Sequence, residues 1–385
     1  MTWLLLVIAL LLFVGLVVVH EYGHYKAAKK DGVVVEEFGI GFPPKVWGKK
    51  LKDGMLFSIN LLPLGGFVKL KGEHDSDKTK GSFGAASLST KVKIMVAGVF
   101  MNLVAAFGIF TILAVVGMPQ LVENQFSVDQ DSQVIRDDAR ILSVEEGSPA
   151  EAAGLESPDI VTAIGPSEHT LVPVAGESGL MELTESFAGE EVTVQVERDG
   201  ETKNLTTTLR DQQTVEDSRD TDEPVGYLGV SPISYTLERS TWSAPIVAAG
   251  TIAQFTWLTL DGVGTALWSL ITGDTATASE QVAGPVGIFA ILRDGTLLGY
   301  EFILMIIGVI SLTLAIMNIL PIPALDGGKL FVMLLYRLLN RIGKKFFNKS
   351  VVLTKRAEEA IHGTGFLALI ILIILITVVD VRRFF

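Results

Sequence analysis

Residues 3–24 read WLLLVIALLLFVGLVVVHEYGH, a stretch that joins a membrane segment to a metal-binding motif. Its first 17 residues are uncharged and end directly at His20, close to the length of helix that crosses a bilayer. A secretory signal peptide is the alternative, but no basic residue precedes the apolar run and no small-residue cleavage site follows it. We therefore expect an uncleaved transmembrane helix.

The rest of the chain has the composition of a multi-pass membrane protein. Of its 385 residues, 49% are hydrophobic and only 19% are charged, whereas soluble domains carry about 25% charged residues. Three further segments are apolar enough to span a membrane, at 94–117, 302–320 and 363–379. There are no cysteines, which excludes disulfides, thiolate zinc sites and cysteine nucleophiles.

Basic residues mark the loops that face the cytoplasm. Residues 25–93 hold 13 Lys against 7 acidic residues, and residues 326–362 hold 8 Lys/Arg. Residues 118–242, in contrast, hold 7 Lys/Arg against 26 Asp/Glu. We expect the two basic loops inside and the acidic region outside, with both termini outside and four crossings of alternating direction.

The first predicted helix ends in His20-Glu21-Tyr22-Gly23-His24, an H-E-x-x-H motif. Residues four apart share a helix face, so both imidazoles can bind one zinc, while Glu21 can take a proton from the metal-bound water. A chance match on a solvated helix end is the alternative. It is disfavoured because polar side chains at membrane depth are costly and usually functional.

A catalytic zinc needs a third protein ligand. The candidate is Asp326 in residues 318–328, NILPIPALDGG, where two prolines break the third apolar helix at its inner end. Irregular backbone at that depth is tolerated beside a water-filled cavity. The predicted topology brings Asp326 to the same depth as the two histidines. An ordinary turn aspartate after a helix stop is the alternative.

The H-E-x-x-H motif, followed by a distant N-x-x-P-x-P-x-L-D-G, resembles the site-2 protease family, the intramembrane zinc metalloproteases of the M50 class. The likeness extends to residues 39–42, 63–67 and 284–288. It implies one catalytic Zn²⁺ held by His20, His24 and Asp326. It also implies Glu21 as the general base and Asn318 as a residue that holds the substrate backbone.

The resemblance also implies a setting: the plasma membrane of a prokaryote, with the active site toward the cytoplasm. Single-span membrane proteins would be cut in regulated intramembrane proteolysis, after an upstream site-1-type protease, and no nucleic acid is involved. A catalytically inactive PDZ-bearing membrane scaffold is one alternative, although all four chemically required residues are present. A transporter is another, although the two halves show no repeat.

Two regions are expected to handle substrate. Residues 56–71 predict a β-hairpin with its turn at Gly65 and Gly66, whose edge could pair with an extended substrate. The resemblance implies that this hairpin is membrane-associated; a plain cytoplasmic hairpin is the alternative. In the acidic region, residues 147–160 and 227–230 resemble bacterial PDZ domains, although Ser157-Pro158 stands where Pro-Gly is usual. Such a domain either binds peptides or excludes bulky substrates, and we favour exclusion.

The expected fold is an α-helical polytopic membrane protein with four transmembrane helices, a membrane-associated β-hairpin and one extracytoplasmic α+β PDZ-like domain. The first membrane half covers 1–117, the PDZ-like domain 118–239 and the second membrane half 299–385. Residues 240–298 are expected to form an interfacial amphipathic segment on the outer face. A crossing there would put Asp326 on the side opposite the histidines and leave the basic loop outside.

Overall fold

The computed structural model describes residues 2–73, 77–198, 200–219, 221, 224–274, 277, 283–347 and 354–384. Two compact units are formed, one of Met1–Ile112 with Pro245–Phe385 and one of Leu113–Ala244. The PDZ-like domain predicted at 118–239 falls inside the second unit. Of the predicted segments 240–298 and 299–385, residues 275–276, 278–282, 348–353 and 385 lie outside the described residues.

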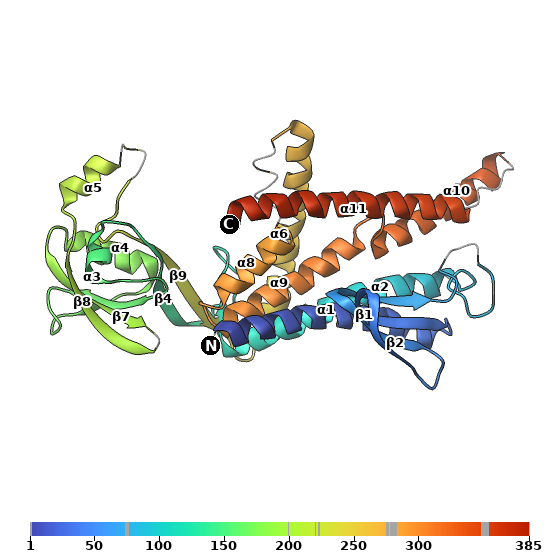
Figure 1. Cartoon of the computed structure of the whole chain (residues 1–385), viewed down its shortest axis with the longest axis horizontal. Helices are drawn as coiled ribbons and strands as arrows, with labels where there is room; N and C mark the ends of the chain where they lie inside the picture. Colours follow the sequence, from blue (N-terminus) through green and yellow to red (C-terminus); the bar gives the residue numbers. More distant parts are fainter. Residues whose placement is uncertain are drawn as a thin grey trace. The chain divides into compact units, whose positions relative to one another are not determined.

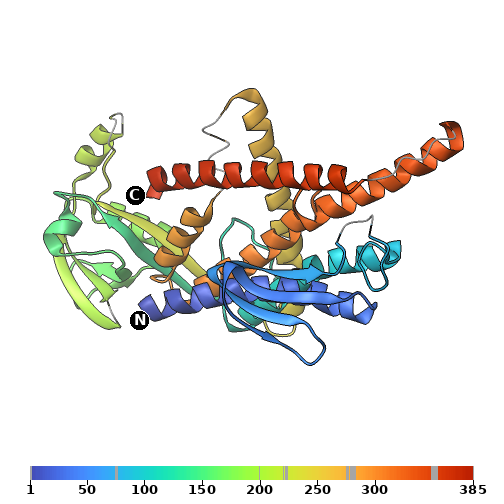
Figure 2. The same cartoon turned by 45° about the vertical axis from the view of Figure 1, so that its right-hand side comes forward.

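Among the described residues, five helices are long and apolar enough to cross a membrane (Figure 1). They are α1 (Thr2–Lys30), α2 (Leu88–Val116), α6 (Ala244–Thr272), α9 (Tyr300–Ile319) and α11 (Lys355–Phe384). Four of them cover the predicted spans, except that α2 and α9 each end one residue before the predicted end. The fifth, α6, is one helix of 29 residues within the region where the sequence predicted an interfacial amphipathic segment. The predicted number of four crossings is therefore not confirmed. In both views, α6 runs across the direction of α1 and α11 (Figures 1 and 2).

Apolar contacts join α1 to α9 and to the shorter α8 (Pro285–Gly295). The buried residues of this cluster are Leu6, Ala9 and Leu16 of α1, Leu292 of α8, and Ile303 and Ile307 of α9. Because lipid is as apolar as these side chains, close packing holds such helices together. At Gly308 of α9, the ring of Phe110 from α2 occupies the space of a side chain, and this ring lies 6.5 Å from that of Phe255 on α6.

A small sheet follows α1, formed by β1 (Val35–Lys50) and β2 (Leu56–Leu70). The sequence placed both arms of a hairpin within 56–71, but the structure pairs β2 with β1, and Ile40 lies opposite Gly66. The turn lies at Asp53-Gly54 instead, where Gly54 has φ +87° and donates its N–H to Leu51 O at 3.0 Å. An Asp-Gly pair is a strong turn signal, because only glycine adopts that φ without strain.

The second unit is an α+β domain. Its strands are β3 (Met118–Pro119), β4 (Gln133–Val144), β5 (Ile160–Gly165), β6 (Val172–Pro173), β7 (Glu191–Arg198), β8 (Glu201–Thr208) and β9 (Val230–Arg239). Its helices are α3 (Pro149–Ala153), α4 (Gly176–Ser186) and α5 (Gln212–Ser218). The strand order is β3-β9-β4-β5-β7-β8, with β6 beside β5. The core includes Ile141, Ile164 and Val194, which are fully buried.

The segment predicted as a helix followed by a turn, 147–160, forms α3 and the loop after it. Ser148 begins the helix by accepting the N–H of Glu151, and Gly154 ends it in the left-handed conformation. Asp159 in the loop is fully buried, and Arg198 of β7 binds both of its carboxylate oxygens at 2.6 and 2.7 Å. This pair fixes the loop against the sheet.

Candidate metal centre

Helix α1 positions two imidazoles on one face. His20 and His24 lie one helical turn apart and are 8% and 7% exposed, so both rings are enclosed by protein although they end an apolar segment. The rings meet edge to face with centroids 4.8 Å apart. The H-E-x-x-H spacing therefore produces the paired orientation that the sequence predicted.

Asp326 reaches these histidines because the chain breaks after α9. It is the first residue of α10 (Asp326–Phe347), and the residues before it are irregular, with Ala324 at φ +83°. Any side chain at Gly327 would collide with the backbone of Ile319 and Leu320, and one at Gly328 with that of Ile322. The two glycines after Asp326 therefore allow the tight turn that brings its carboxylate back toward α1.

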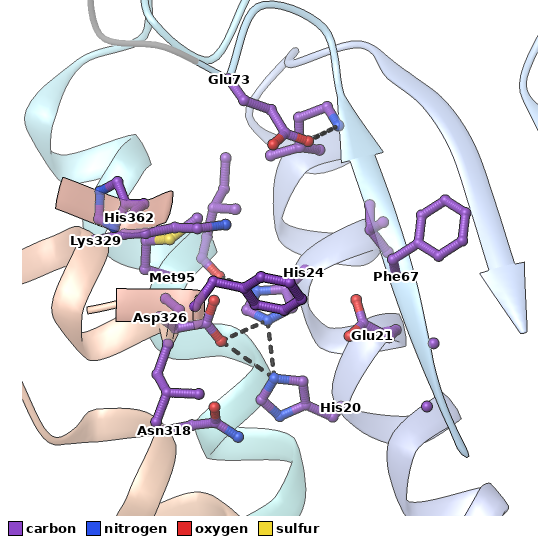
Figure 3. A pocket seen from close by; sticks show the side chains of 18 of the residues that line it. His20, Glu21, His24, Phe67, Glu73, Met95, Asn318, Asp326, Lys329 and His362 are labelled. Atoms are coloured by element: carbon purple, nitrogen blue, oxygen red, sulfur yellow. Dashed lines mark hydrogen bonds and ion pairs between the residues drawn. The ribbon is translucent and has the colours of Figure 1, made fainter. Parts of the chain in front are cut away.

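The three ligand atoms form a compact triangle (Figure 3). Asp326 Oδ2 lies 3.2 Å from His20 Nε2 and 3.0 Å from His24 Nε2, and the two nitrogens are 3.1 Å apart. Ligand atoms held tetrahedrally at about 2.0–2.1 Å from zinc are about 3.3 Å apart. The triangle therefore has the size that one zinc ion requires.

The hydrogen bonds of His24 also fit a cation at this point. Its Nδ1–H donates to the carbonyl oxygen of Ile94 at 2.7 Å, and a carbonyl can only accept. In the neutral imidazole, Nε2 then presents a lone pair to the Asp326 carboxylate. Two electron-rich atoms at 3.0 Å repel each other unless a cation lies between them. The donor set therefore suits zinc.

Helix α2 packs closely against α1 at the metal centre, and this close packing was not predicted from the sequence. A side chain built at Gly98 would collide with His24 Nε2 and would lie 2.7 and 2.8 Å from His20 Cε1 and Nε2. Between the two histidines, a side chain at Gly23 of α1 would collide with the backbone of Ala97. These two glycines allow α1 and α2 to approach, and Gly98 leaves the space in which the ligand atoms meet.

A cavity of about 660 Å³ surrounds the centre. All seven predicted site residues line it: His20, Glu21, His24, Gly65, Gly66, Asn318 and Asp326. Figure 3 shows Glu21 on the side of β2, near Phe67. A side chain at Gly66 would lie 3.3 Å from Glu21 Cγ, so β2 directly adjoins the predicted base. The structure thus brings the separate predicted motifs to one cavity.

Other lining residues were not predicted. Asn102 of α2 is 1% exposed, and neither polar atom of its amide has a hydrogen-bond partner among the described residues. Lys329 of α10 and His362 of α11 line the same cavity. In the sequence, Asn102 is one polar residue in a long apolar run, and His362 begins the last span without a motif. Only the fold identifies them as neighbours of the metal centre.

Comparison with known proteins relates the chain to metalloproteases. The chain matches the family model of peptidase family M50 over residues 8–357. It is 28% identical to a Clostridium perfringens protein assigned as a zinc metalloprotease, with 98% of each chain covered. It is 25% identical to the zinc metalloprotease RasP of Shouchella clausii, covering 97% of this chain and 98% of that one. RasP of Oceanobacillus iheyensis is 24% identical, with 98% and 99% covered.

Proposed function

Because the chain belongs to peptidase family M50, the site-2 protease family, and is a zinc metalloendopeptidase, we propose that it cuts single-span membrane proteins inside the bilayer. The observation that carries the proposal is the convergence of three side chains at 3.0–3.2 Å. His20 and His24 lie on α1, and Asp326 follows α9, and both helices are apolar enough to lie in the membrane. A peptide bond can reach such a centre only if it lies in or near lipid itself.

The four chemical residues divide into ligands and a base. His20, His24 and Asp326 hold the zinc, which when bound supplies a Lewis acid that makes water a nucleophile near neutral pH. The Glu21 carboxylate accepts the proton of the attacking water and returns it to the nitrogen of the leaving amine. Its place on α1, beside His20 and facing the cavity, supports this role.

The substrate must present an extended backbone, because a helix hides its peptide bonds in internal hydrogen bonds. Residues 66–70 of β2 pair with residues 35–40 of β1, and Gly66 adjoins Glu21. An unwound substrate can add as a strand beside β2 and so reach the base. The half-buried amide of Asn318 lines the same cavity and can hold the substrate backbone.

The remaining parts of the proposal concern the setting. The charge distribution supports a prokaryotic plasma membrane with the acidic second unit outside and the catalytic cavity toward the cytoplasm. That unit is the proposed PDZ-like domain, which excludes bulky substrates until an upstream site-1-type protease has trimmed them. Its α+β core, with the helix-then-turn segment at α3, supports the PDZ-like assignment.

The test separates metal binding from catalysis. Glu21→Gln in the purified full chain should keep its zinc, because no ligand is lost, yet cleave a transmembrane reporter about 10²–10⁴-fold more slowly. Asp326→Ala should lose both zinc and cleavage, whereas Tyr22→Phe, at a 44% exposed neighbour, should change neither. Substantial cleavage by Glu21→Gln would overturn the assigned base, and no cleavage by the wild-type zinc protein would favour an inactive scaffold.

A further inference from the structure

Helix α10 separates apolar from basic side chains more sharply than the helices that span the membrane. It starts at Asp326 and joins α9 to α11, and it is not among the five candidate spans. At 3.6 residues per turn, six of its large apolar residues fall on one side. They are Phe331, Leu334, Leu335, Leu338, Ile342 and Phe346.

This apolar side of α10 is exposed. Phe331 is 49% exposed, Leu338 54% and Phe346 68%, whereas Lys329 and Met333, on the opposite side, line the catalytic cavity. An exposed apolar surface of this extent marks contact with lipid or with another protein. One side of α10 therefore faces the catalytic cavity, and its apolar side is exposed for contact with lipid or with another protein.

The charge of α10 indicates which partner. Apart from Asp326 the helix has no acidic residue, and its exposed cations beyond Lys329 are Arg337, Arg341, Lys344 and Lys345. Arg341 and Lys345 fall at the edge of the apolar side, where a second copy of the helix would bring like charges together. The phosphates of an anionic leaflet would instead neutralise them, at about a fivefold gain in partitioning for each basic residue.

We propose that α10 is an anchor for an anionic lipid surface. Its apolar side enters the acyl boundary of the cytoplasmic leaflet, and its arginines and lysines reach the headgroup phosphates. If the proposed function holds, the anchor also has a catalytic consequence. Asp326 is the first residue of α10, so lipid that restrains the helix restrains the carboxylate of the metal centre.

Spin labels test the anchor without any measurement of activity. The chain has no native cysteine, so single cysteines at Leu338, Ile342, Arg337 and Arg341 can each carry a nitroxide in the full chain, reconstituted in phosphatidylcholine–phosphatidylglycerol vesicles. Labels at Leu338 and Ile342 should be relaxed by oxygen and shielded from a water-soluble nickel reagent, and labels at the arginines should show the reverse. Equal access at all four positions, or broadening from a second label nearby, would overturn the proposal.

The dependence of label depth on lipid composition tests the role of the basic residues of α10. Raising the phosphatidylglycerol fraction should move the Leu338 label deeper, and a quadruple change of Arg337, Arg341, Lys344 and Lys345 to Gln should abolish this response. The matched control neutralises Lys45, Lys49, Lys50 and Lys52, four exposed cations around the β1–β2 turn, and should keep it. A response that survives the first set, or is lost with the second, would contradict the anchor. A lost cleavage reaction with an unchanged label depth would bear on the proposed function alone.

Discussion

Among single residues, Gly98 gives the sharpest test of the metal centre. Gly98→Ala adds one methyl group at a point where it would collide with His24 Nε2 and crowd His20 Nε2. Interior packing leaves little room to relax, because α1 and α2 already touch at Gly23 and Ala97. We expect zinc affinity, measured by competition with a chromophoric chelator, to fall by at least about 10–100-fold. A loss of this size is typical when residues that support metal ligands are changed.

Gly108→Ala is the matched control for this change. It lies on the same helix, α2, with no atom within 4 Å of the added methyl group. Because alanine is a better helix former than glycine, this variant should bind zinc as the wild type does and melt slightly higher. Equal zinc affinity in both variants would show that Gly98 does not shape the centre.

The predictability of the site differs from residue to residue. His20, Glu21 and His24 form a local motif whose geometry follows from helical periodicity alone. Asp326 is 306 positions from His20 and could be named only from the proline-broken segment and the family resemblance. Gly98 and Asn102 could not be found, because a glycine and an asparagine in an apolar helix carry no signal until another helix packs against them.

At the scale of elements, β2 is predicted to limit the chemistry through its contact with α1. Gly66→Ala would place a methyl group 3.3 Å from both Glu21 Cγ and Val17 Cγ1. Displacing the base or the strand by a fraction of this distance should slow cleavage on the order of tenfold to a hundredfold, with zinc content unchanged. Rates on several helical reporters, measured beside zinc content, check this.

Gly48→Ala provides the comparison within the same sheet. Its methyl group would lie 3.3 Å from the ends of the Leu56 and Lys45 side chains, which can move aside, and far from α1 in the strand register. We expect nearly wild-type cleavage. If both alanine variants cleave at the wild-type rate, strand addition next to Glu21 is not how the substrate is held.

The same elements show what pattern reading missed. The alternation in 56–71 correctly indicated strand, but the pairing was wrong because Asp53-Gly54 forms the turn and 35–50 supplies the partner. In the sequence, the basic residues of α10 were used only to orient the loop, so the apolar side of this helix was not predicted. Long apolar helices were found reliably, since their length is imposed by the bilayer, whereas pairing depends on contacts between distant residues.

For the whole molecule, the path of the chain around α6 constrains its topology. Gly98 and His362 mark the level of the metal centre on α2 and α11. From that level α2 and α11 run in the same direction (Figures 1 and 2), and Ala114 and Asp380 lie 16 and 18 residues further along, about 24 and 27 Å by helical rise. The chain leaves α2 at that side, where Ser240 N–H donates to Ala114 O, and returns to it where Gly284 adjoins Asp380. Because both points lie on the same side, the chain between them crosses the membrane either twice or not at all. If α6 crosses, the residues after it must cross back.

The length of the chain after α6 argues against a double crossing. Only ten residues separate Gly273 from Gly284, too few for a second helical crossing, which takes about 20 residues. An extended return through lipid would leave its backbone polar groups unpaired, at several kcal/mol each. Trp257 and Trp268, 70% and 67% exposed and three helical turns apart on one side of α6, suit the headgroup boundary. These features support an interfacial α6 and four crossings.

Labelling in intact cells decides between the two topologies. With no native cysteine in the chain, a single cysteine at Asp274, which is exposed just after α6, should react with a membrane-impermeant maleimide added from outside. A cysteine at Thr354, exposed just before α11, should react only after the cells are permeabilised. If α6 crossed, Asp274 would lie inside, α9 would run outward, and Asp326 would end about a bilayer away from His20. The reverse labelling pattern would therefore contradict the interfacial α6 and the metal centre together.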